Sequence, residues 1–192
     1  MRRLGAVLAL LACTAFGAAR AEAPPAVVLQ HAPGVEMRGS GTLRWLGLRI
    51  YDAVLWAAPA RPAGTNGTTG TTGTTVADFD YTRPFALQLR YARSLKGAAI
   101  ADRSVEEITR LGLGSPAQRA QWGAAMRRLF PDVVDGTTLA GVHLPGRGAR
   151  FYLNGQPLGE IADPAFSQAF FAIWLDAKTS APELRSALLG AS

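Results

Sequence analysis

The sequence predicts an α+β fold in which a large antiparallel sheet is packed by helices. The first observation is the order of the patterns: strand-like segments, two helical segments, a second group of strand-like segments, and two more helical segments. The second is Asn154-Gly155, a two-residue turn typical of an antiparallel hairpin. The 192 residues suffice for one ordinary domain, and with 48% hydrophobic residues they can bury a sizeable core.

Residues 1–21 have the features of a secretory signal peptide. Two arginines follow Met1, an apolar run continues to Ala19, and Ala19-Arg20-Ala21 fits the small-x-small rule of signal peptidase. We expect cleavage after Ala21, which leaves residues 22–192 as one periplasmic domain. The apolar run of about 16 residues is short for a membrane span, so no stable membrane insertion is expected after cleavage.

Cysteine content and charge exclude several classes of protein. The one cysteine, Cys13, lies in the signal segment, within a sequence that loosely resembles a lipoprotein processing box. A disulfide framework and a multi-cysteine zinc site are therefore excluded. The chain has 20 Lys and Arg against 14 Asp and Glu, and three of these arginines precede the cleavage site. The remaining basic residues are scattered, so we expect no nucleic-acid partner.

The first half of the domain contains three strand-like stretches and one low-complexity tract. Residues 22–35 are proline-rich and lead into the first strand. Residues 42–56 are apolar and partly β-branched, which indicates one long strand or two strands joined near Asp52. Residues 57–75 form a Gly/Thr-rich tract that we expect to be a flexible loop. Residues 85–91 alternate in polarity, the pattern of a half-buried strand.

Two helices are predicted between the strand groups. Ser104-Val-Glu-Glu107 has the form of a capping box and predicts the start of a helix that Gly112 ends. Ser115-Pro116-Ala-Gln118 predicts the start of a second helix, with proline at its first position, which runs to about Leu129.

The last third of the chain predicts three strands and two helices. The strands cover residues 138–144, 149–153 and 158–161. Asp163-Pro164 predicts the start of a helix, and another is expected from Ala181-Pro182 to Gly190. The first of these helices carries an aromatic stripe for which core packing is the expected role: Phe166, Phe170 and Trp174.

The residues offer no recognisable catalytic set. His31 and His143 have no Cys, Asp or Glu nearby at metal-ligand spacing, and both are expected to be structural. A Gly-x-Ser-x-Gly nucleophile motif is absent from the sequence, and Glu106 and Glu107 are adjacent on a helix, so they point in different directions. We therefore expect no catalytic residues, no metal and no cofactor.

Cationic side chains within an apolar stretch are the most unusual feature. Arg38, Arg44 and Arg49 lie in or beside residues 42–56, close to Tyr51. An arginine and a tyrosine hydroxyl opening into an apolar pocket would clamp a carboxylate or a phenolate. Arginines that extend along a solvated face are an equally good explanation.

Several motifs together match one known family. They are Gly41-x-x-Arg44-Trp-x-Gly-Leu-x-Ile-Tyr51-Asp-Ala-x-Leu-Trp56, residues 89–97, Phe130-Pro-Asp132, residues 151–161 and residues 169–175. They resemble the exported bacterial chalcone isomerase-like proteins over about residues 35–190. The resemblance implies an open-faced β-sandwich whose large antiparallel sheet is packed by helices, with a ligand cleft between sheet and helices.

The resemblance also implies positions for a ligand site. At three positions where the catalytic isomerases have polar residues that contact the substrate, this chain has Ile100, Glu107 and Ile173. Chalcone cyclisation depends on positioned polar donors, so their loss should remove most of the rate.

The fatty-acid-binding relatives hold a carboxylate with an arginine and a tyrosine. Tyr51 stands at the tyrosine position, and the arginine is Arg44 or Arg38, with Arg44 the better match to the bacterial motif. A bulge at Gly39 or Gly41 would change which face these arginines occupy.

The leading hypothesis is a non-catalytic periplasmic protein that binds a fatty acid or a similar amphipathic anion. The alternatives are a chalcone isomerase-type intramolecular lyase and an envelope scaffold that binds a protein partner through an exposed aromatic surface.

Overall fold

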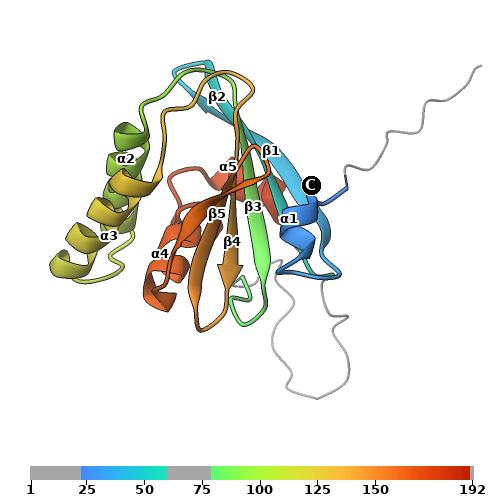
Figure 1. The fold of residues 1–192 in the computed structure, drawn as a ribbon. Coiled ribbons are helices and arrows are strands. Elements are labelled where there is room, and N and C mark those ends of the chain that lie inside the picture. Colours follow the sequence, from blue (N-terminus) through green and yellow to red (C-terminus); the bar gives the residue numbers. More distant parts are fainter. Residues whose placement is uncertain (1–22, 60–78, 191–192) are drawn as a thin grey trace, which may run out of the picture.

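The computed structural model describes residues 23–59 and 79–190 (Figure 1). The predicted signal peptide, Cys13 and most of the Gly/Thr-rich tract lie outside the described residues. Within the described part, no helix is both long enough and apolar enough to cross a membrane.

Six strands form one antiparallel sheet in which the spatial order equals the chain order, so each strand pairs with its neighbours in sequence. The strands are β1 (Glu36–Trp45), β2 (Leu48–Ala57), β3 (Phe85–Tyr91), β4 (Thr138–Leu144), β5 (Gly148–Leu153) and β6 (Gln156–Ile161). Tight turns join β1 to β2, β4 to β5 and β5 to β6, whereas longer segments join β2 to β3 and β3 to β4. The single antiparallel sheet packed by helices confirms the predicted α+β class.

The helices pack mainly against one face of the sheet, as Figure 1 shows. On this face α4 contacts β4 and β5, α5 contacts β1 and β2, and α2 packs between α3 and α4. The short helix α1 contributes to a second, smaller cluster around Trp56 on the opposite face. The helices are α1 (Ala26–Leu29), α2 (Gly97–Arg110), α3 (Pro116–Leu129), α4 (Pro164–Leu175) and α5 (Pro182–Leu188).

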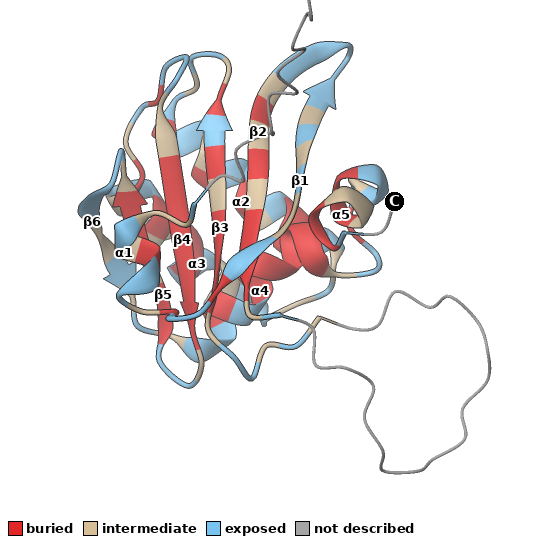
Figure 2. Ribbon diagram, turned by 90° about the vertical axis from the view of Figure 1, so that its right-hand side faces the viewer, coloured by how far each residue is buried: buried red, intermediate tan, exposed pale blue. Residues whose placement is uncertain are grey.

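The main core lies between the sheet and the helices. Every second residue of a strand points towards this core, as the alternation of buried and less buried residues along β2 and β3 shows (Figure 2). The aromatic stripe of α4 fills its centre, where the rings of Phe166 and Phe170 stack with centroids 5.4 Å apart. Core packing, the role expected for this stripe, is therefore confirmed.

Local turn and cap chemistry agrees with the sequence at several points. The Ser115 hydroxyl and the Gln118 side chain form a complete capping box at the start of α3. Asn154 and Gly155 take positive φ angles of 50° and 79°, as the turn between β5 and β6 requires. The Asp163 carboxylate caps α4 by accepting hydrogen bonds from two backbone amides.

Two local expectations were wrong, and one short helix was not expected. The break in residues 42–56 is at Leu46-Gly47 and not near Asp52, because these two residues supply the positive φ angles of a hairpin turn. Helix α2 begins at Gly97 and not at Ser104, whose hydroxyl instead donates to the carbonyl of Ile100 inside the helix. The proline-rich leader contains α1, which the sequence pattern did not indicate.

Candidate functional site

Tyr51 lies in the main core near the hairpin end of β2. Only 9% of it is exposed, and its hydroxyl accepts a 2.9 Å hydrogen bond from Nε1 of Trp174 on α4. The ring of Tyr91 packs edge-on against it, with centroids 5.8 Å apart. Burial raises the pKa of Tyr51 to about 12, so this residue is a neutral phenol at physiological pH.

The three residues that the resemblance places at the isomerase contacts belong to α2 and α4, which pack against each other. Ile100 and Ile173 contribute apolar surface to the core. The Glu107 side chain is only 6% exposed, and its carboxylate pairs with Arg103 and, at 2.8 Å, with Nε of Arg110. Glu107 and Tyr51 lie within electrostatic reach of each other, since the negative charge of Glu107 raises the pKa of Tyr51.

Arg44 occupies a different environment from Tyr51. It is exposed and lies opposite Arg49 in the β1–β2 pairing, directly after a register shift at Leu43. Arg49 in turn pairs with Asp52. Leu43, and not Arg44, is the residue opposite Tyr51. The structure therefore does not bring the Arg44 side chain to the buried Tyr51 hydroxyl.

Arg38 lines a pocket at the other end of β2. It lies at a second register shift, between Met37 and Gly39, where β1 bends beside Leu55 and Trp56. Leu55 lies four residue steps after Tyr51 in β2, which is about 13 Å along the strand. Arg38 and Tyr51 are thus carried by the same strand pair but lie in different parts of it.

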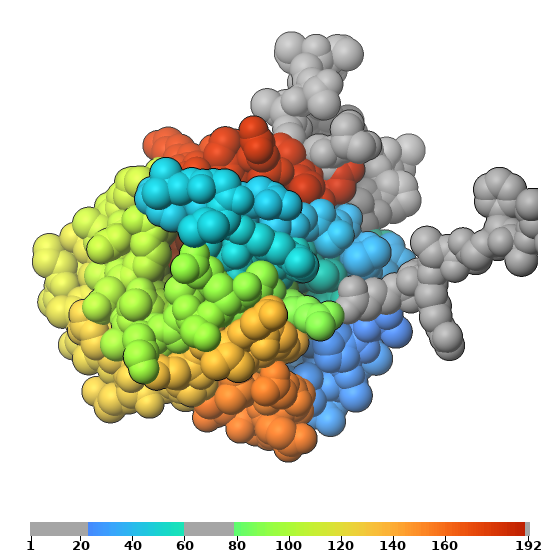
Figure 3. Space-filling view, turned by 90° about the horizontal axis from the view of Figure 1, so that it is seen from above, coloured from blue at the N-terminus to red at the C-terminus, as the bar shows by residue number. Residues whose placement is uncertain are grey.

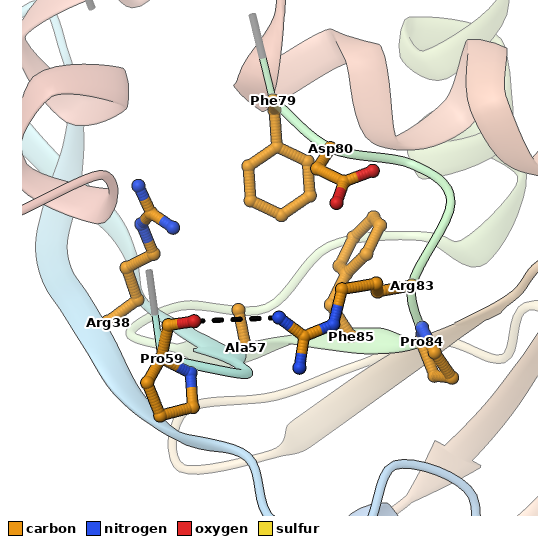
Figure 4. A pocket seen from close by; sticks show the side chains of 8 residues that line it. All are labelled: Arg38, Ala57, Pro59, Phe79, Asp80, Arg83, Pro84 and Phe85. Carbon is orange, nitrogen blue, oxygen red and sulfur yellow. Dashed lines mark hydrogen bonds between the residues drawn. The ribbon is translucent and has the colours of Figure 1, made fainter. Parts of the chain in front are cut away.

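The pocket has a volume of about 170 Å³ and combines cations with apolar surface. Figure 4 shows Arg38 and Arg83 on opposite sides of it. The rings of Phe79 and Phe85 pack edge to face, with centroids 4.7 Å apart. The residues that line the pocket are Arg38, Ala57, Pro59, Phe79, Asp80, Arg83, Pro84 and Phe85.

Hydrogen bonds hold Arg83 and Asp80 in place. Nη1 of Arg83 donates to the carbonyl oxygen of Pro59 at 3.5 Å. The Asp80 carboxylate accepts hydrogen bonds from the backbone amide and the hydroxyl of Thr82, at 2.9 and 2.6 Å. The pocket therefore contains two guanidinium groups and one carboxylate, which accepts hydrogen bonds from Thr82. The net positive charge of these three groups favours binding of an anion.

Behind the pocket, two buried polar atoms in the described part of the chain have no hydrogen-bond partner: the Tyr81 hydroxyl and Nη2 of Arg185. The Tyr81 ring packs edge-on against Phe79 and Phe85, with centroids 5.5 and 5.7 Å apart. Burial raises the pKa of Tyr81, whereas the charge of Arg185 lowers it, so the Tyr81 hydroxyl and the Arg185 guanidinium lie within electrostatic reach. Buried donors without partners are rare and costly.

Both histidines have structural partners. The Nδ1 atom of His143 lies 2.7 Å from the Ser167 hydroxyl and Nε2 lies 2.9 Å from the Tyr81 carbonyl oxygen. The Nε2 atom of His31 lies 2.6 Å from the Tyr152 hydroxyl. Across residues 23–59 and 79–190 no three His, Cys, Asp or Glu side chains are grouped so that they could hold a metal ion.

The sequence singled out Arg38 as a candidate but not Phe79, Arg83 and Phe85, which line the same pocket. Phe79 and Arg83 follow the Gly/Thr-rich tract, which has no periodicity from which a position could be derived. Their only sequence signal is the aromatic and cationic composition of residues 79–85 immediately before and into β3.

Comparisons with known proteins agree with this architecture. The family model described as chalcone isomerase-like matches residues 72–190. None of the curated proteins is similar enough in sequence to count as a match. Among solved structures, a fatty-acid binding protein of Arabidopsis thaliana is similar with a TM-score of 0.57 and 12% identity, over 83% of this chain and 88% of that chain. At that identity the likeness concerns the fold, whereas the family match covers more than half of the sequence. The protein therefore belongs to the chalcone isomerase-like family.

Proposed function

We propose that this protein is a non-catalytic binding protein for a fatty acid or a similar amphipathic carboxylate. The observation that carries the proposal is the pocket in which Arg38 and Arg83 flank an aromatic and aliphatic lining. The fold shared with a fatty-acid binding protein supports it.

The chemistry of the pocket suits the two ends of such a ligand. A guanidinium group offers a planar fork of donors that matches a carboxylate. The rings of Phe79 and Phe85 offer apolar surface, and each methylene buried there contributes about 0.8 kcal/mol. The cavity of about 170 Å³ is smaller than the roughly 300 Å³ at which sites for whole drug-sized ligands begin. We infer that it holds the carboxylate and the first carbons of the chain.

Of the two arginines that the sequence suggested, the pocket favours Arg38. Its side chain lines a cavity with aromatic residues, whereas Arg44 is exposed beside another arginine. Tyr51 then has a packing role in this proposal, because its hydroxyl is bonded to Trp174.

The proposal assigns no catalytic residue. Ile100 and Ile173 supply no polar donor, and Glu107 is paired with two arginines. Cyclisation of a chalcone requires donors aimed at the developing charge, which these side chains do not offer.

The proposed site of action is the periplasm. It depends on the predicted signal peptide over residues 1–21, and fractionation of cells that express the full chain, with mass spectrometry of the mature N-terminus, tests it.

The test of ligand binding compares two arginine variants. Saturated fatty acids of increasing chain length are titrated into the protein by calorimetry, and an organic extract of the freshly purified protein is analysed by mass spectrometry. We expect Arg38→Ala to weaken binding at least tenfold, and Arg44→Ala, the matched control at an exposed arginine, to bind as the unaltered protein does. Affinity should stop rising with chain length once the pocket is filled.

Equal affinity in the Arg38→Ala and unaltered proteins would overturn the assignment to this pocket. Loss of binding in Arg44→Ala alone would instead move the site to the hairpin end of β2.

A further inference from the structure

The turn of the β1–β2 hairpin exposes three large apolar side chains. We call Trp45, Leu46 and Leu48 the hairpin tip; they are 61%, 86% and 53% exposed. Figure 2 shows the exposed end of this hairpin beyond the buried part of the sheet. Exposed apolar residues are common singly, but three around one turn form a patch that usually marks an interaction surface.

The backbone of the hairpin tip adds a second observation. Leu46 has a φ of 48° and Gly47 a φ of 79°, the two positive angles of a tight hairpin turn. Asn or Gly fits the Leu46 position without strain, whereas the β-carbon of leucine is crowded there. A large apolar residue is thus kept at a position where local structure and water both favour a small or polar one.

The charges around the hairpin tip are mainly cationic, with Arg44, Arg49 and Arg93 against Asp52 and Asp135, and point to an anionic partner. Arg44 and Arg49 lie directly opposite each other, a like-charge pair that destabilises a sheet. Arg93 follows β3 beside the hairpin, where the amide of Ala92 donates to the Ile50 carbonyl. Arg49 pairs with Asp52, whereas Arg44 and Arg93 form no ion pair with other residues of the described part of the chain. Figure 3 shows the hairpin and the segment after β3 together on one face.

We propose that the hairpin tip docks onto the surface of an anionic lipid bilayer. Tryptophan and leucine side chains would enter the interfacial region, where an amphipathic indole is stable, and the arginines would lie among lipid phosphates. A second copy of the chain suits this surface less well, since a symmetric contact would bring the same unpaired arginines together. The inference is independent of the ligand pocket, which lies at the opposite end of β2.

Trp45 provides a direct readout, because Trp56, Trp122 and Trp174 are buried. The protein is mixed with vesicles of pure phosphatidylcholine or of phosphatidylcholine with phosphatidylglycerol, and binding is followed by flotation and by tryptophan emission. We expect binding to the anionic vesicles with a blue shift of the emission, at least tenfold weaker binding to pure phosphatidylcholine, and weakening by salt.

Leu46→Asn is the decisive variant. Asparagine accepts the positive φ, so the fold should persist, and thermal unfolding verifies this; vesicle affinity should fall at least tenfold. Leu29→Asn is the matched control, since Leu29 is 41% exposed on α1, and it should bind as the unaltered protein does. Arg44→Ala should weaken binding, and Arg44→Lys should restore it.

Unchanged vesicle binding in Leu46→Asn, or equal binding to both lipid mixtures, would overturn the proposal. So would a stable dimer that Leu46→Asn dissociates while vesicle binding is absent.

Discussion

Tyr51 and Tyr81 are two tyrosines whose buried hydroxyls have different surroundings. The Tyr51 hydroxyl accepts a hydrogen bond from Trp174, whereas the Tyr81 hydroxyl has no partner in the described part of the structure. Burial raises the pKa of both, so each is protonated throughout the physiological range. Removing the oxygen atom should therefore have opposite consequences at the two positions.

Tyr51→Phe should lower the free energy of unfolding by about 1–3 kcal/mol, because it leaves the buried indole N–H of Trp174 without an acceptor. Tyr81→Phe should be neutral or stabilising, because it removes a buried hydroxyl that lacks a partner. Urea unfolding of both variants measures the difference.

A Tyr51→Phe protein as stable as the unaltered one would show that the Tyr51–Trp174 hydrogen bond contributes nothing. Combining Tyr51→Phe with Trp174→Phe provides the control, since the double variant should lose less than the sum of the single losses.

Single candidate residues could be recognised from the sequence, but their neighbours in the folded protein could not. Tyr51 was recognisable from its motif, but its partner Trp174 lies 123 residues away, a contact that no spacing reveals. The face of the sheet that Arg38 and Arg44 each occupy depends on two register shifts in β1, each of which resets the strand alternation. Phe79 and Arg83 follow a tract without periodicity, so their place beside Arg38 emerges only from the tertiary structure.

At the scale of elements, α5 lies against β1 because two glycines leave room for it. A β-carbon added at Gly39 would lie 2.1 and 2.6 Å from the carbonyl oxygens of Ala187 and Leu188. One added at Gly41 would meet side-chain atoms instead, Cδ1 of Leu184 at 2.8 Å and Cβ of Ala187 at 3.0 Å. Backbone oxygens cannot move without moving the helix, whereas a leucine methyl group can rotate away.

Gly39→Ala should therefore be the more destabilising of two matched changes. We expect a loss of about 2–4 kcal/mol for Gly39→Ala and of about 1–2 kcal/mol for Gly41→Ala, in the range of other overpacked sites. Chemical denaturation gives both values, and a larger loss at Gly41 would contradict this account of the β1–α5 contact.

Element boundaries were predictable where local chemistry determines them. The Ser115–Gln118 capping box and the Asn154-Gly155 turn are complete within a few residues, and both were correct. The start of α2 was not, because it depends on distant residues. The Gly97 amide donates to the Asp132 carboxylate, and a β-carbon on Gly97 would lie 2.1 Å from the Phe130 carbonyl oxygen. Neither contact is visible in the sequence around residue 97.

At the scale of the whole molecule, stability should fall first when the histidines take up protons. Burial lowers the pKa of His143, and burial together with the charge of Arg150 lowers that of His31. The unfolded chain, with histidine pKa values of about 6.5, then binds protons more readily than the folded one. The stabilisation is complete above about pH 6.5 and decreases as the pH falls below that value.

The pH dependence can be measured by urea unfolding between pH 8 and pH 5. Below about pH 6.5 the free energy of unfolding should decrease as the pH falls. Its slope should approach about 1.4 kcal/mol per pH unit for each histidine that stays neutral in the folded protein. His143→Gln should flatten the curve, and an unchanged curve in that variant would assign the effect elsewhere. The exposed carboxyls of Asp132 and Glu160, whose pKa values are lowered by Lys96 and Arg150, should add a small further loss at lower pH.

The overall architecture was predictable because the strand patterns, the helix patterns and the turn residues all indicate the same fold. Two groups of alternating segments separated by helices specify an antiparallel sheet packed by helices, and the order of the strands in space is their order in the chain. The set of side chains that line one pocket was less predictable than the fold, since it depends on contacts between residues far apart in the sequence.

The open sheet has consequences for how the protein avoids pairing with other chains. A sheet that does not close leaves two outer strands whose free backbone groups are templates for aggregation. In this protein β1 contains two register shifts and is partly covered by α5, which makes it a poor template. On the other side, β6 is only six residues long and contains Pro157, which has no amide hydrogen to offer. Both margins of the sheet thus resist addition of a foreign strand.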